Sequence, residues 1–111
     1  MKVLNSKYYS IDTPSGILHI HIDYDDNNVI QEVFLRISPI GTDISNITAM
    51  LGVFLSESLK RGLPIEKAIK HLNSSKSHRK VILKEDTNIE TIEQGIAFCL
   101  KKYYNEFIKE K

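Results

Sequence analysis

The stretch ISPIGTDISNITAMLGVFLSESLKRGLP, residues 37–64, decides the fold of this chain. A turn that contains Pro39 and Gly41 precedes an apolar-faced helix, and Gly62 and Pro64 follow that helix. Glycine adopts the left-handed conformation that often ends a helix, and proline fits the first position of a new one. The stretch therefore predicts two consecutive helices that meet at a tight corner.

Apolar residues recur at intervals of three and four along the first of these helices and predict a core-facing stripe. The stripe consists of Ile44, Ile47, Leu51, Phe54, Leu55 and Leu59. The opposite, solvated face consists of Asn46, Ser56, Glu57 and Lys60. Thr42, Asp43 or Ser45 is predicted to cap the first turn. Gly52 costs up to ~1 kcal/mol relative to alanine in mid-helix, so another backbone is expected to pack closely there.

Two alternating runs before this stretch, residues 16–23 and 29–38, predict an antiparallel hairpin joined by a polar loop. A less regular run, residues 3–13, predicts a short edge strand. The core-facing positions of the hairpin are Leu18, Ile20, Ile22, Val33, Leu35 and Ile37. The other face of the sheet, which carries Ile17 and Phe34, is expected to stay open.

Two more helices are predicted after the corner. The first is short, ends at Asn73, and turns inward Ile65, Ala68, Ile69 and Leu72. The last begins near Ile89 and has a stripe of Ile92, Ile96, Cys99, Leu100, Tyr103 and Phe107. Between them, residues 74–80 are expected to form an exposed loop, and residues 81–83 a brief strand or extended segment.

Strands followed by helices predict an α+β domain in the order β-β-β-α-α-α, with a small antiparallel sheet covered on one face by two to three helices. A chain of 111 residues is long enough for one such domain, residues 1–111. Its net charge of +1 excludes a strong general field for nucleic acid or an anionic membrane. No signal-like or membrane-length apolar run occurs, which predicts a cytoplasmic protein.

One candidate anion site is the turn before the long helix, with Gly41, Thr42 and Ser45 as ligand-binding residues. Free amides and the dipole at a helix N-terminus attract phosphate, and the two hydroxyls would add donors. Simple helix capping is the alternative interpretation. Asp43 favours capping, because its carboxylate would compete with phosphate for the same amides.

A second candidate anion site is the loop with Lys76, His78, Arg79 and Lys80, which places four potentially cationic groups within five residues. Arginine offers a bidentate fork for phosphate, and the interleaved serines add neutral donors. The alternative is an ordinary solvated loop. No aromatic residue alternates with these charges, so a nucleic-acid partner is not expected.

Metal and thiol chemistry are weaker alternatives. His19 and His21 point the same way on one strand, next to Glu32 across the hairpin, and such a set binds zinc when a firm third ligand is present. An ordinary polar sheet surface is the commoner alternative, and a mixed apolar and polar surface that packs against another copy, formed by Ile17, Phe34, His19 and His21, is favoured instead. No metal and no cofactor are therefore predicted. Cys99 is the single cysteine, which excludes an internal disulfide, and its place on an apolar stripe favours a buried side chain over a reactive thiol.

From Thr13 to Leu72 the order of these signals resembles the TSCPD domain, a C-terminal module of adenosylcobalamin-dependent ribonucleotide reductases that also occurs in short stand-alone proteins. The matching pieces are TPSGILHIHID, EVFLRI and PIGTDISNITAMLGVFLSESLKRGLPIEKAIKHL. The name-giving cysteine motif is missing, because KEDTNIETIEQGIAF stands where it is expected. The resemblance therefore implies a domain associated with nucleotide metabolism that holds a nucleotide or a partner without thiol chemistry.

The leading functional hypothesis is a non-enzymatic homo-oligomeric module that captures a small phosphorylated ligand, a nucleotide or nucleotide-derived signal, as a viral or bacterial nucleotide sponge would. The Gly41 turn and the Arg79 loop would converge on that ligand within one protomer or across a subunit boundary, with Tyr9 or Tyr104 over a base. The alternative is a protein-interaction or regulatory subunit of a nucleotide-metabolising enzyme such as a ribonucleotide reductase.

Overall fold

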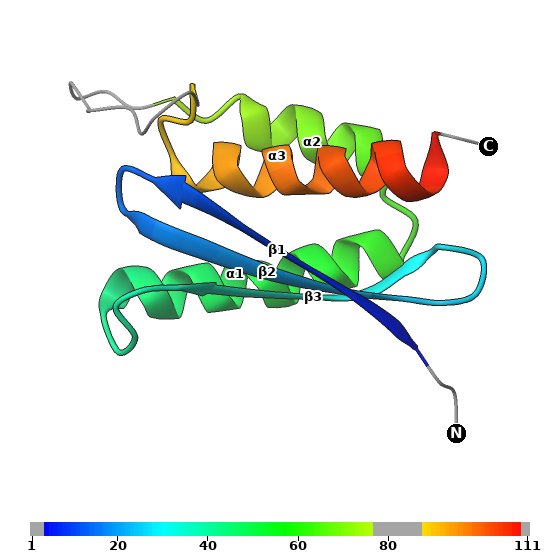
Figure 1. The fold of residues 1–111 in the computed structure, drawn as a ribbon, viewed down its shortest axis with the longest axis horizontal. Helices are drawn as coiled ribbons and strands as arrows, with labels where there is room; N and C mark the ends of the chain where they lie inside the picture. Colours follow the sequence, from blue (N-terminus) through cyan, green and yellow to red (C-terminus); the bar gives the residue numbers. More distant parts are fainter. Residues whose placement is uncertain (1–3, 77–87, 110–111) are drawn as a thin grey trace.

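A computed structural model describes residues 4–76 and 88–109, in which a three-stranded sheet is followed by helices (Figure 1). The predicted α+β class and the order β-β-β-α-α-α are confirmed. A π-helical turn, Tyr104–Ile108, extends the last helix. In chain order the elements are β1 (Asn5–Thr13), β2 (Gly16–Tyr24), β3 (Ile30–Ile37), α1 (Asp43–Lys60), α2 (Ile65–Asn73) and α3 (Ile92–Tyr103). The segment predicted at 81–83 lies outside the described residues.

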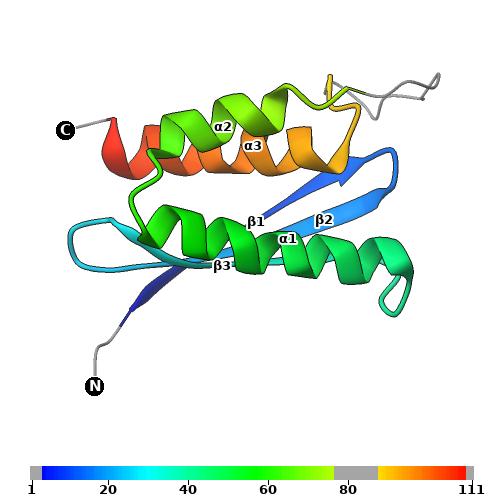
Figure 2. The ribbon, with the colours of Figure 1, turned by 180° about the vertical axis from the view of Figure 1, so that it is seen from behind.

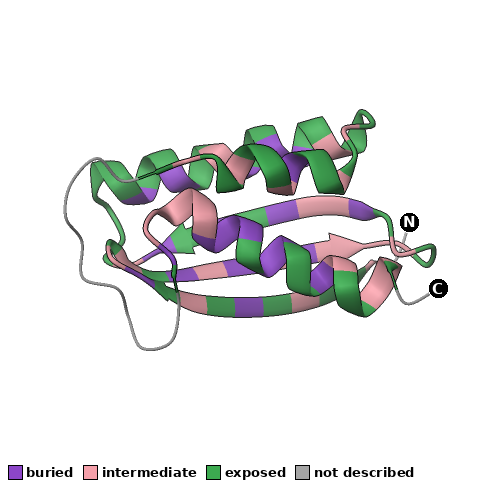
Figure 3. Cartoon of the chain, turned by 90° about the horizontal axis from the view of Figure 1, so that it is seen from above, coloured by how far each residue is buried: buried purple, intermediate pink, exposed green. Residues whose placement is uncertain are grey.

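The three strands form an antiparallel sheet in the order β1-β2-β3, and one face of it carries the core. All six residues predicted to face inward are at most 5% exposed: Leu18, Ile20, Ile22, Val33, Leu35 and Ile37. Buried and more exposed positions alternate along the strands in Figure 3. The opposite face is open as predicted, since Ile17 and Phe34 are 46% and 54% exposed.

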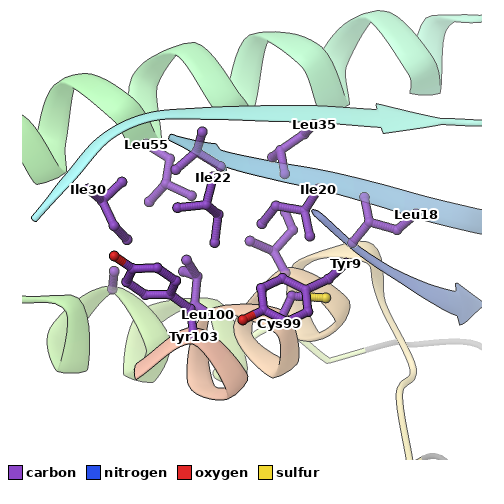
Figure 4. Close-up of a cluster of buried hydrophobic side chains, with 13 residues drawn as sticks. Tyr9, Leu18, Ile20, Ile22, Ile30, Leu35, Leu55, Cys99, Leu100 and Tyr103 are labelled. Atoms are coloured by element: carbon purple, nitrogen blue, oxygen red, sulfur yellow. The ribbon is translucent and has the colours of Figure 1, made fainter. Parts of the chain in front are cut away.

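Helix α3 covers the core face of the sheet, and α2 packs beside α3 (Figures 1 and 4). The predicted apolar stripe of α3 is confirmed, because Ile96, Cys99, Leu100 and Tyr103 are at most 1% exposed. The Tyr103 hydroxyl also donates to the carbonyl oxygen of Asn28 at 2.7 Å, which ties the helix end to the hairpin loop.

The predicted start of the last helix near Ile89 is three residues too early. Thr91 is the N-cap, and its hydroxyl oxygen accepts a hydrogen bond from the Gln94 N–H at 3.1 Å. Ile89 is buried in the extended segment before the cap. Its burial explains why it fits the apolar pattern although it is not helical.

Helix α1 runs along the edge of the sheet next to β3, as the view from behind shows (Figure 2). A Cβ added at Gly52 would lie 3.1 Å from the Val33 carbonyl oxygen and 3.3 Å from the Leu35 nitrogen, which confirms the expected close approach of another backbone. The Val33 N–H donates to the Ser56 hydroxyl oxygen at 2.8 Å, and that oxygen lies 3.0 Å from the Val33 carbonyl. The helix therefore occupies the place of a fourth strand and covers an edge that would otherwise be free to pair.

The predicted faces of α1 are partly wrong. Ser56 was expected in solvent and is 4% exposed, whereas Ile44, Ile47 and Phe54 were expected in the core and are 49%, 69% and 65% exposed. Leu55 is buried and Leu51 and Leu59 are partly buried. The physical reason is that a helix can approach a strand edge only through small side chains. The buried residues of α1 are accordingly Ser45, Thr48, Gly52, Leu55 and Ser56.

The corner between α1 and α2 matches its prediction closely. Gly62 has a φ of +107°, the left-handed conformation expected after a helix. Pro64 is the N-cap of α2 and not its first residue, so the predicted boundary is one residue early. None of the helices in the described ranges is long and apolar enough to span a membrane.

Candidate ligand-binding site

The turn before α1 brings Gly41, Thr42 and Ser45 together, and their groups bond one another. The Thr42 hydroxyl oxygen accepts from the Ser45 N–H at 3.1 Å and donates to the Pro39 carbonyl at 3.2 Å. The Ser45 hydroxyl oxygen accepts from the Gly41 N–H at 3.2 Å. Capping therefore already uses both hydroxyls and two of the amides, and phosphate binding at this turn stays a prediction.

The second predicted anion site is described only at its first residue. Lys76 is exposed just after α2, and His78, Arg79 and Lys80 lie outside the described residues. In the view of Figure 1 the chain that leaves α2 lies at the top, in the layer of α2 and α3, whereas the turn before α1 lies at the bottom, beyond the end of β3. Within one protomer, the described parts of the two predicted sites are therefore not brought together.

A cleft of about 550 Å³ opens along α3 on the side that faces away from the core. It is lined by Asn73, Asn88, Ile89, Gln94, Ala97, Phe98, Lys101, Lys102 and Asn105. Ligand sites for small molecules usually have volumes of ~300–1,000 Å³ and few polar groups on an apolar wall. The cleft fits that description in size and combines an exposed aromatic ring with amides and ammonium groups.

The electrostatics of the cleft favour an anion. The described lining residues supply two ammonium groups and four side-chain amides, and none of these described residues carries a carboxylate. Phe98 is 46% exposed, and the Lys102 Nζ lies 5.9 Å from the centroid of its ring. The side-chain amides of Asn73, Asn88 and Asn105 form no hydrogen bond to the described part of the chain, so they are available to a ligand.

Gln94 joins the two walls of the cleft. Its side-chain nitrogen donates to the Ser75 carbonyl at 2.6 Å, and its side-chain oxygen accepts from the Glu90 N–H at 2.8 Å. These bonds fix the chain leaving α2 against the chain entering α3.

Sequence reasoning missed this cleft, although a signal was present. Gln94, Phe98, Lys101 and Asn105 recur at intervals of three and four, which places them on one face of the last helix. Asn73 is far from this face in sequence, and only the packing of α2 against α3 brings it there, whereas Asn88 lies in the short segment before the N-cap of α3.

On the outer face of the sheet, the three residues considered as zinc ligands contact other side chains. The Tyr8 hydroxyl is hydrogen-bonded to His19 Nδ1, and the Tyr8 ring lies 4.8 Å from the His21 ring. Burial, followed by the positive charge of Arg36, lowers the pKa of His19. Glu32, which was considered as a zinc ligand together with the two histidines, forms an ion pair with Lys60 at 2.7 Å. The described residues contain no group of three or more histidine, cysteine and acidic side chains that could hold a metal ion.

Two further candidates are core residues. Cys99 is 1% exposed, as predicted, and burial raises the pKa of its thiol to about 12. Tyr9 is 7% exposed and its hydroxyl donates to Glu106, so the expectation that it covers a base is wrong. Tyr104 is partly exposed, and its hydroxyl donates to Glu66 at 3.0 Å.

Comparison with known proteins gives one match. The family model of the TSCPD domain matches residues 4–104, a wider span than the segment from Thr13 to Leu72 that carries the sequence resemblance. Searches of curated proteins and of solved structures found no significant match.

Proposed function

This chain belongs to the TSCPD domain family, which is associated with ribonucleotide reductases, and from that premise we propose that it is a non-catalytic module that binds a small phosphorylated ligand, a nucleotide, in the α3 cleft. The observation that carries the proposal is the described lining of the cleft, which has two ammonium groups, four amides and a half-exposed phenyl ring and no carboxylate among these described residues.

Each chemical group of a nucleotide has a counterpart in this lining. Lys101 and Lys102 supply positive charge for phosphate oxygens, and charge-assisted hydrogen bonds of this kind are the stronger ones. Phe98 offers a ring face on which a base stacks. The asparagine amides both donate and accept, which suits the edge of a base or a ribose hydroxyl.

The same lining argues for binding without chemistry. Among the residues that the structure describes, the lining includes no histidine, cysteine or carboxylate that would serve as a general base or a nucleophile. The cleft is favoured over the turn before α1, because the hydroxyls of Thr42 and Ser45 are engaged in capping.

The first experiment is a thermal-shift screen with nucleoside mono-, di- and triphosphates, cyclic dinucleotides and inorganic phosphate. A ligand that binds only the folded state raises the melting temperature with concentration, by mass action. Calorimetry then measures the affinity of the best ligand for Phe98→Ala, Lys101→Gln and Lys102→Gln. We expect each lysine variant to bind ~10-fold or more weakly, the range for a lost hydrogen bond to a charged group.

The matched control is Lys67→Gln, which removes an exposed lysine of α2 that does not line the cleft. Its affinity for the ligand should equal that of the wild type. Unchanged affinity in all three cleft variants would move the site elsewhere. Arg79→Ala, measured alongside, tests the sequence-based prediction for the 74–80 loop.

The association of the family with ribonucleotide reductases favours a second candidate, a regulatory subunit of a nucleotide-metabolising enzyme. Under this alternative, no nucleotide in the screen raises the melting temperature. Addition of the chain to a ribonucleotide reductase would then change the turnover of the reductase, whereas a ligand-binding module leaves turnover at saturating substrate unchanged.

A further inference from the structure

We propose that the exposed apolar strip of α1 is a two-fold interface between two copies of this chain. The strip consists of Ile44, Ile47, Met50, Val53 and Phe54, which are 49–69% exposed. It shares no residue with the α3 cleft, so the inference stands independently of the proposed ligand. It also differs from the open sheet face that the sequence suggested as the interface.

The size of the strip suits a second copy. Five large apolar side chains that are each about half or more exposed present on the order of 500 Å², the upper range for the largest apolar patch on a monomer. Ile40, in the turn before α1, is 71% exposed and extends the strip. With its polar rim, this area approaches the ~800 Å² that each partner contributes to a standard interface.

The shape of the strip is complementary to itself. Phe54 projects from its C-terminal half and is 65% exposed. A hollow of about 120 Å³ lies at its N-terminal half and is lined by Ile44, Ile47, Thr48, Leu51, Ile92 and Glu93. When two α1 helices pack antiparallel, a two-fold axis near Met50 brings each Phe54 to the hollow of the partner. Such reciprocal contact is the property of an isologous interface.

The charges at the ends of α1 agree with this antiparallel arrangement. Asp43 lies at the N-terminal end of the helix, and Arg61, with a side chain 82% exposed and an ion pair to Glu57 at 3.5 Å, follows its C-terminal end. A two-fold axis places the N-terminal end of each helix near the C-terminal end of its partner, so the helix dipoles oppose one another favourably. A parallel arrangement would bring like charges together.

The first test is the molar mass by light scattering across a range of protein concentrations, without ligand. We expect the wild type to reach twice the chain mass of 12.7 kDa and Phe54→Asp to stay at 12.7 kDa. Phe34→Asp is the matched control, because Phe34 is 54% exposed on the open sheet face. It should keep the dimer mass. A monomeric wild type, a dimeric Phe54→Asp variant or a monomeric Phe34→Asp variant would overturn the proposal.

A cross-link tests the position of the axis even where a charged variant folds poorly. Met50→Cys places a thiol next to its own copy across the axis, so oxidation with diamide should give a disulfide-linked dimer in high yield. The native Cys99 is buried and should not form a disulfide under these conditions. Val29→Cys, at a position 51% exposed in the β2–β3 loop, is the control and should remain monomeric on a denaturing gel. Equal yields from the two variants would refute the antiparallel strip.

Discussion

Helices α1 and α3 both carry apolar residues at intervals of three and four, yet they use that pattern in opposite ways. In α3 the apolar stripe lies on the sheet face and is dry, with Ile96 and Leu100 at 0% exposure. In α1 the apolar strip faces outward, and the helix contacts β3 through Ser56 and Gly52. The same periodicity therefore marks a core in one helix and a free surface in the other.

The difference follows from what each helix packs against. A sheet face presents side chains, so a helix that covers it needs large apolar side chains to fill the space between the two layers. A strand edge presents backbone N–H and C=O groups, so a helix beside it needs small residues and a hydroxyl to satisfy them. Apolar residues at helical spacing show that a helix has an apolar and a polar face. The surface against which the helix packs, a sheet face or a strand edge, determines which of the two faces is buried.

The largest expected effect compares two isoleucines on these two helices. Ile96→Ala should lower the free energy of unfolding by about 2–5 kcal/mol, because it leaves a cavity in the core. Ile47→Ala should change it by less than about 0.5 kcal/mol, because its side chain is 69% exposed. Urea unfolding in a Phe54→Asp background removes the contribution of self-association. Similar losses in both variants would mean that the strip is part of the monomer core.

A smaller effect compares glycines at the two helix–sheet contacts. Gly52→Ala should lower the free energy of unfolding by about 1–3 kcal/mol, because its methyl group would meet the backbone of β3 at 3.1 Å and α1 must shift. Gly95→Ala should be nearly neutral. There the methyl group meets the side-chain ends of Thr13 and Leu18 at 3.1 and 3.2 Å, and the gain in helix propensity of ~1 kcal/mol offsets the adjustment. Thermal unfolding of both variants checks the difference, and a stabilised Gly52→Ala variant would contradict it.

The fold was largely predictable because its local signals agree with its global arrangement. Alternation assigned all six inward positions of β2 and β3, and capping residues placed α1 between Thr42 and Gly62. The outward strip was not predictable from period alone, because nothing in the local pattern shows that α1 lies beside β3. Gly52 gave the single hint, since a glycine in mid-helix indicates a close backbone.

The candidate site was predictable only in part. The polar face of α3 is visible in the sequence, but Asn73 joins it through the packing of α2 against α3. The turn before α1 shows the converse, because a pattern that suits phosphate also suits capping. Sequence could not separate the two interpretations at Thr42, whereas the hydrogen bonds show that the hydroxyl is already used.

The buried thiol of Cys99, on the apolar stripe of α3, should make the free energy of unfolding fall by ~1.4 kcal/mol per pH unit in alkali. Burial raises the pKa of Cys99 from its ordinary value of 9.0 to about 12 and also raises the pKa of Tyr103. Above about pH 9 the unfolded chain loses the thiol proton while the folded chain keeps it, so stability is intact below that pH and falls as pH rises toward 12. The buried residues of α1 are not ionisable and add nothing to this loss.

Cys99→Ala isolates the thiol from the other groups that titrate in alkali. The variant should be destabilised relative to the wild type by ~1.4 kcal/mol less at about pH 10 than at about pH 7.5. The reason is that only the unfolded wild type gains free energy by losing a thiol proton at the higher pH. Urea titrations of both proteins at both pH values provide the measurement. Parallel pH profiles for the two proteins would show that Cys99 is solvated in the folded chain.

The smallest expected effect compares the N-caps of the two helices and decides between the two candidate ligand sites. Thr42→Ala and Thr91→Ala should each lower the free energy of unfolding by about 1 kcal/mol, because each hydroxyl oxygen accepts one N–H of the first turn at 3.1 Å. If the ligand occupies the α3 cleft, neither variant changes its affinity, since neither threonine lines the cleft. If phosphate binds at the turn before α1, Thr42→Ala weakens binding and Thr91→Ala does not. Because the two variants match in stability, calorimetry with the ligand from the thermal screen separates the loss of a ligand contact from the loss of a cap.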